Sequence, residues 1–85
     1  MILLVALLLA APGPYSQAQR LLRQDRPQEA LVLLQAARAK EPRSATVATD
    51  LGSTLLRLGS RDEAEAAFRS AIALDPRRDS AYVQL

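Results

Sequence analysis

The sequence contains no cysteine, no histidine and no asparagine, and only 4% of its residues are aromatic. The absence of cysteine excludes disulfides and thiolate nucleophiles, and the absence of histidine removes the most common metal ligand and the usual general base at neutral pH. Serines and carboxylates are present, but no base stands in plausible partnership with a nucleophile. We therefore predict that the chain is not an enzyme and has no metal site and no cofactor.

No long run of charges of one sign is present either. Ten arginines and one lysine are interspersed with nine acidic residues, which leaves a formal net charge of +2. Such a pattern is typical of a mixed, solvated surface. Nucleic-acid binding needs basic residues clustered along one face, so it is the less favoured alternative. A length of 85 residues fits one small domain.

The chain begins with an uncharged apolar run, Met1 to Ala11. As a helix, the ten residues after Met1 would span about 15 Å, half the hydrocarbon thickness of a bilayer. The run suits the hydrophobic core of a secretory signal, with possible cleavage after Ala18. A hydrophobic helix packed on the rest of the chain and a truncated membrane anchor are the alternatives. We expect an exported (bacterial periplasm or secreted) or membrane-associated protein more than a cytoplasmic one, with any membrane contact made only through residues 1–11.

Two segments of the chain resemble each other at an offset of 34 residues. Aligning residues 18–51 with residues 52–85 gives ten identities, where chance alone would give roughly three. A fixed offset of this size is typical of stacked helical units.

The second copy has the pattern of two amphipathic helices. Gly59 is expected to end the first helix. Ser60 and Glu63 form a capping box that would begin the second helix, and Asp75-Pro76 would end it. Apolar residues at helical spacing form one stripe on each helix: Val47, Ala48, Leu51, Leu55 and Leu58, then Ala64, Ala67, Phe68, Ala71 and Leu74.

The first copy repeats this scheme less clearly. Asp25 is the expected N-cap of its second helix, Pro27 lies in the first turn, and Ala30, Leu33, Leu34 and Ala37 would face inward. We therefore predict an all-α fold with four parts: a hydrophobic segment over 1–13, a degenerate first unit over 14–43, a well-preserved second unit over 44–78, and the start of a third unit over 79–85.

Small residues predict where the helices approach closely. Gly52 and Ala64 would face each other across the second hairpin, and Ala18 and Ala30 supply the same small pair in the first. The bulky side chain one turn further on, Phe68 or Leu34, would fill the wedge where the hairpin opens.

Taken together, Leu51-Gly52, Leu55, Ala64, Phe68, Ala71 and Pro76 resemble the tetratricopeptide repeat signature. The Trp and Tyr of the ideal motif are replaced by Ala48 and Leu55, and the first copy matches more weakly. The resemblance implies a short right-handed α-solenoid of antiparallel helical hairpins, with about two repeats and the start of a third. The residues that it assigns to packing within and between repeats are Ala18, Ala30, Leu34, Leu51, Gly52, Leu55, Ala64, Phe68, Ala71 and Pro76.

The same resemblance implies an inner groove, lined by the first helix of each repeat, that grips a peptide or protein segment. The groove residues that it assigns are Gln19, Leu22, Arg23, Thr46, Thr49, Asp50, Ser53, Leu56 and Arg57.

Two features of these residues bear on the ligand. The pairs Leu22-Arg23 and Leu56-Arg57 recur one repeat apart, so the ligand would be partly apolar and partly acidic. Alternatively, the leucines fill the seam between repeats and the arginines are only solvated. The carboxylate clamp of some chaperone adaptors uses lysine and asparagine and is not expected, because the chain has no asparagine and its only lysine, Lys40, lies near the end of a second helix.

The sequence thus predicts a protein–protein interaction or scaffold module that binds a polypeptide segment, whose identity stays open. The alternative is structural self-association through an uncapped end of the array, around Ala67, Ala71, Tyr82 and Leu85.

Overall fold

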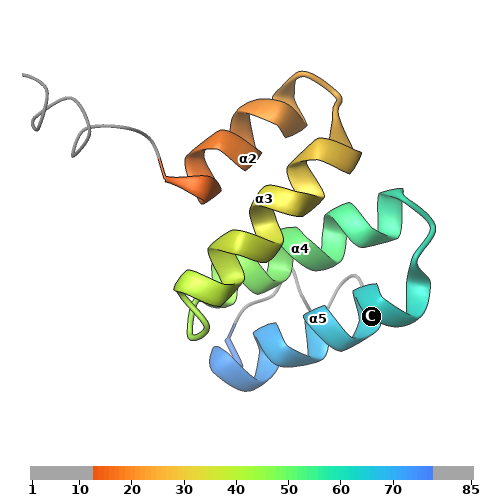
Figure 1. Cartoon of the computed structure of the whole chain (residues 1–85). Helices are drawn as coiled ribbons and strands as arrows, with labels where there is room; N and C mark the ends of the chain where they lie inside the picture. The colour runs from red at the N-terminus through yellow and green to blue at the C-terminus, as the bar shows by residue number, and fades with distance from the viewer. Residues whose placement is uncertain (1–12, 78–85) are drawn as a thin grey trace, which may run out of the picture.

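The computed structural model describes residues 13–77 and contains no strand within them. The expected all-α fold is confirmed (Figure 1). The apolar run Met1–Ala11 lies outside the described residues. So does the predicted start of a third unit over 79–85, which contains Tyr82 and Leu85. The helices are α2 (Pro14–Arg23), α3 (Pro27–Lys40), α4 (Ala45–Arg57) and α5 (Arg61–Leu74).

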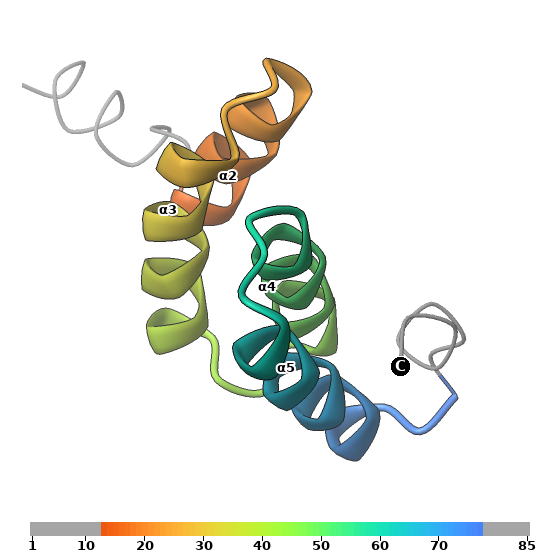
Figure 2. The ribbon, with the colours of Figure 1, turned by 90° about the vertical axis from the view of Figure 1, so that its right-hand side faces the viewer.

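The four helices form two antiparallel hairpins that stack on each other. α2 packs against α3, α4 packs against α5, and α3 joins the hairpins by packing against α4. α2 and α4 run in one direction, and α3 and α5 run in the opposite one (Figures 1 and 2). Equivalent helices of the two repeats are therefore parallel, as expected when one hairpin follows another by a small rotation and translation.

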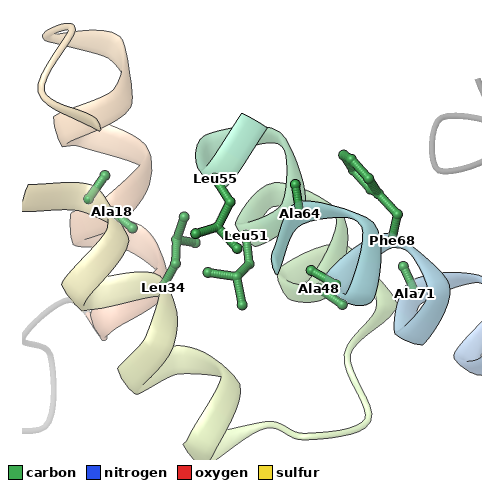
Figure 3. Close-up of a cluster of buried hydrophobic side chains, with 10 residues drawn as sticks. Ala18, Leu34, Ala48, Leu51, Leu55, Ala64, Phe68 and Ala71 are labelled. Carbon is green, nitrogen blue, oxygen red and sulfur yellow. The ribbon is translucent and has the colours of Figure 1, made fainter. Parts of the chain in front are cut away.

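The core lies between the hairpins and within each of them. Leu34 of α3 points toward Leu51 and Leu55 of α4, which closes the space between the two repeats (Figure 3). Phe68 of α5 is the bulkiest of the fully buried side chains, with 1% of its surface exposed. Most of the remaining core is alanine, so the backbones approach closely and a few large side chains provide most of the buried apolar area.

The turn between α2 and α3 differs from the expectation at Asp25. The N-cap of α3 is Arg26, with Pro27 as its first residue, and Asp25 adopts a left-handed conformation with φ of 59°. The Arg26 N–H donates to the Leu21 carbonyl at 2.9 Å, and the Asp25 N–H donates to the Leu22 carbonyl at 3.1 Å. These two bonds are those of a Schellman motif, which needs a left-handed residue where Asp25 stands.

The turn between α4 and α5 has the same construction one repeat later. Gly59 occupies the left-handed position with φ of 86°, and the expected end of α4 at this glycine is confirmed. The equivalent bonds join Ser60 to the Leu55 carbonyl at 2.9 Å and Gly59 to the Leu56 carbonyl at 3.1 Å. Each hairpin is thus closed by the same local motif, with glycine in one repeat and aspartate in the other.

The start of α5 differs from the prediction of a capping box. Ser60 stands at the N-cap of α5, but its side chain makes no capping hydrogen bond, so the predicted capping box with Glu63 does not form. At the start of α4, the Ser44 hydroxyl accepts a bond from the Val47 N–H at 3.2 Å. The serine side chain that caps a helix in the second repeat is therefore Ser44, one helix earlier than expected.

Gly52 contacts a different partner from the one expected. A Cβ atom built on Gly52 would lie 2.7 Å from Phe68 Cε1 and 2.8 Å from Phe68 Cδ1, and these ring atoms are its nearest neighbours. The edge of the Phe68 ring thus occupies the space that any side chain at position 52 would need. Ala64 is buried, but the close approach at Gly52 is made to an aromatic ring of α5.

Four residues in and just after α5 differ in exposure from the prediction: two are more buried and two are more exposed. Ala67 is 7% exposed and Ala71 is fully buried, so these alanines do not form the exposed apolar end that was expected. Leu74 is 38% exposed and does not face inward, and Pro76 is exposed and not packed in the repeat. Both follow Ala71, the last buried residue of α5.

Candidate functional site

Side chains of α2 and α4 form a continuous face, which we call the α2/α4 face. Residues three or four apart share one side of a helix, so this face takes one row from each helix. Because the two helices are parallel (Figure 1), the rows lie side by side in the same direction. The rows are Tyr15, Gln19, Leu22 and Arg23 on α2, and Thr46, Asp50, Ser53, Leu56 and Arg57 on α4.

Asp50 is the centre of the polar contacts on this face. The Tyr15 hydroxyl donates to Asp50 Oδ2 at 2.5 Å, and Gln19 Nε2 donates to the same oxygen at 2.9 Å. All three side chains are half-buried. Hydrogen bonds to an ionised acceptor are stronger than neutral ones, so this cluster holds the first half of α2 against the middle of α4.

A second contact joins the two repeats at the other end of the face. Arg57 donates to Asp25 Oδ1, which lies in the turn after α2. The Asp25 side chain is 84% exposed and the Arg57 side chain is 48% exposed. A pair this exposed contributes little to stability. The guanidinium of Arg57 can therefore exchange Asp25 for another carboxylate at small cost.

The two leucines of the repeated Leu-Arg pair are in different environments. Leu22 is half-buried and packs against the core cluster, whereas Leu56, one repeat later, is 40% exposed. Leu22 thus fits the alternative in which the leucine packs between the repeats. Of the two leucines, only Leu56 presents an apolar side chain at the surface. Arg23, beside Leu22, is exposed.

Two residues of this face differ from the sequence prediction. Thr49 is 4% exposed and its hydroxyl donates to the Ala45 carbonyl at 2.8 Å, so it does not face a ligand. Thr46 and Ser53 are half-buried. Tyr15 belongs to the face but was missed. It precedes Thr49 by one repeat length, but Thr49 is buried, so the offset by itself does not show that Tyr15 reaches Asp50.

Two open hollows lie on the part of the surface that the structure describes, and Tyr15 is the one residue of the α2/α4 face that lines either of them. One, of 270 Å³, lies over Leu51 and Leu55 and has Arg38 of α3 and Glu63 and Ala66 of α5 in its lining. Another, of 220 Å³, lies between the start of α2 and the end of α3. None of the groove residues predicted from the sequence lines either hollow.

Within residues 13–77, no group of three or more acidic side chains is placed to hold a metal ion. No helix in this part of the chain has the length and apolarity needed to cross a bilayer.

Stacked antiparallel hairpins, each with a buried alanine core and a left-handed turn residue, define a helical repeat protein. A family model described as tetratricopeptide repeat matches residues 21–85. The chain therefore belongs to the tetratricopeptide repeat family, whose repeats generally mediate protein–protein interaction. No curated protein matches the sequence.

Proposed function

We propose that this protein binds an extended segment of another polypeptide along the α2/α4 face. The observation that carries the proposal is the exposure of Leu56 between polar and charged neighbours on this face. An exposed apolar side chain rimmed by polar groups can anchor an aliphatic side chain of a ligand. Arg23 and Arg57 would contribute the charged contacts, which favours a ligand that is partly apolar and partly acidic.

The test of this proposal replaces the exposed leucine. Random peptides displayed on phage are selected on the immobilised full chain, and the enriched peptides are synthesised and titrated against variants. Leu56→Ser is expected to weaken their binding about tenfold, because the ligand loses its apolar anchor. The readout is the dissociation constant from fluorescence anisotropy.

Two controls locate the binding surface. Val32→Ser removes an apolar side chain of α3 that is 65% exposed, and it should leave binding within about twofold. Ala66→Arg places a large side chain at the hollow between α3 and α5 and should also have little effect. Equal losses for Leu56→Ser and Val32→Ser would contradict the proposal. So would a loss on Ala66→Arg alone, or a failure of any peptide to enrich.

A separate proposal concerns location: we propose that the protein is exported or membrane-associated, on the basis of the apolar run Met1–Ala11. Ala18 is fully buried within α2, so cleavage after it would remove Tyr15 and half of that helix. When the native host is fractionated and the intact mass of the protein is measured, we expect the protein in a membrane or extracytoplasmic fraction. A chain with Met1 retained in the soluble cytosolic fraction would contradict this proposal.

A further inference from the structure

The α2/α4 face carries a negative charge near its middle and positive charges at one end. Asp50 lies in the half that also holds Tyr15 and Gln19, while Arg23 and Arg57 lie at the ends of their helices. Among residues 13–77, the ion pairs are Arg26–Glu29, Arg57–Asp25 and Arg69–Glu65, so no cation lies within 4.0 Å of the Asp50 carboxylate. The negative charge of Asp50 is therefore stabilised by neutral donors and is not compensated by any cation there.

The two neutral donors leave the second oxygen of the Asp50 carboxylate unengaged. Both neutral donors bond to Oδ2, and Oδ1 accepts no side-chain hydrogen bond within the described part of the chain. The two bonds hold the carboxylate in one orientation, so binding a cation there costs little further ordering of the side chain. A lysine or arginine of a ligand is the chemical group that satisfies both the open oxygen and the uncompensated charge.

From this polarity we propose that the face selects a segment with a basic residue at one end and an acidic residue at the other, separated by an aliphatic residue. This inference rests on the proposed function and names the class of ligand. The basic residue binds Asp50, the aliphatic residue packs on Leu56, and the acidic residue binds Arg23 or displaces Asp25 from Arg57.

Helix geometry sets the spacing in the ligand. Asp50 and Arg57 are seven residues apart, which is about 10 Å along α4 at 1.5 Å per residue. An extended peptide advances about 3.3 Å per residue, so its basic and acidic residues stand about three positions apart. The order of the two charges then fixes the direction in which the segment lies along the helices.

The test uses the peptides selected on the full chain and pairs changes in the protein with changes in the peptide. Asp50→Asn keeps an oxygen that can accept from Tyr15 and Gln19 but removes the charge. It is expected to weaken the selected peptides about tenfold. A peptide whose lysine is replaced by norleucine should bind wild type and Asp50→Asn equally. Arg23→Gln should weaken the parent peptide more than one in which its acidic residue is replaced by glutamine.

Glu65→Gln separates recognition at Asp50 from a general effect of removing a negative charge. Glu65 lies on α5, outside the α2/α4 face, where it pairs with Arg69, so this variant is expected to change peptide affinity by about twofold or less. Thermal unfolding of each variant, followed by circular dichroism, shows whether the fold is kept. Equal losses on Asp50→Asn and Glu65→Gln, or equal losses for the lysine and norleucine peptides, would overturn the inference.

The outcomes for the two proposals are distinct. Peptides that lose affinity on Leu56→Ser but not on Asp50→Asn would overturn the charge-selective ligand and leave the proposed binding face standing. Peptides indifferent to both changes would overturn the face itself. A dimer of the free chain that dissociates on Asp50→Asn in analytical ultracentrifugation would show a second copy as the occupant and would also overturn the inference.

Discussion

Replacing Phe68 with alanine is expected to lower the free energy of unfolding by about 3–5 kcal/mol. Phe68 is 1% exposed, and its neighbours in the core are mostly alanines that cannot move in to fill the vacated space. The loss therefore includes both the transfer free energy of the ring and the cost of the cavity that it leaves. A domain of this size has a total stability of only about 4–13 kcal/mol, so this variant should lose at least about a quarter of it.

Urea denaturation followed by the helical circular dichroism signal measures this effect. Phe68→Leu keeps part of the volume and should fall between wild type and Phe68→Ala. As a control, Val32→Ala shortens a side chain that is 65% exposed on α3, and it should change stability by less than about 0.5 kcal/mol. If Phe68→Ala unfolds at the same urea concentration as Val32→Ala, the packing described for α4 and α5 is wrong.

The second large effect is expected at Gly52. Gly52→Val should lower the free energy of unfolding by about 1–3 kcal/mol, because a Cβ atom would lie 2.7 Å from the ring of a buried phenylalanine. Helix propensity opposes this loss, since glycine in a helix interior costs about 1 kcal/mol relative to alanine. The steric term is larger because Phe68 is only 1% exposed, so its ring cannot move away from position 52 without losing its own packing.

A double-mutant cycle isolates this steric contact. In a Phe68→Leu background the edge of the ring is absent, so Gly52→Val should cost at least about 1 kcal/mol less than it does in wild type. Denaturation of the four proteins of the cycle gives the coupling free energy. Additive costs in the two backgrounds would show that Gly52 is constrained by something other than Phe68.

Local patterns predicted the helices and their turns with one systematic weakness. Apolar spacing, Gly59 and the 34-residue offset were sufficient to place the second hairpin. Asp25 and Ser60 were both assigned as caps from residue type, and neither side chain caps a helix. An aspartate suits an N-cap and also tolerates the left-handed conformation, so its residue type does not distinguish the two positions. Its alignment with Gly59 does.

The binding face was predicted only in part, because exposure depends on how the hairpins are rotated against each other. Leu22 and Leu56 are equivalent in the repeat, yet one packs on the core and the other is 40% exposed. Repeat symmetry assigns equivalent residues to the same row, but the neighbours of each row differ along the array.

By itself, the sequence determined the repeat length, through its internal alignment at an offset of 34 residues. It also determined the all-α class, the glycine that ends α4 and the alanine-rich core, because these follow from spacing within one or two turns of helix. The tertiary structure alone decided that Asp50 receives Tyr15 and Gln19, which are 35 and 31 residues away, and that Phe68 lies against Gly52. Contacts of this kind depend on interhelical distances and angles to within about 1 Å, and periodicity carries no information at that scale.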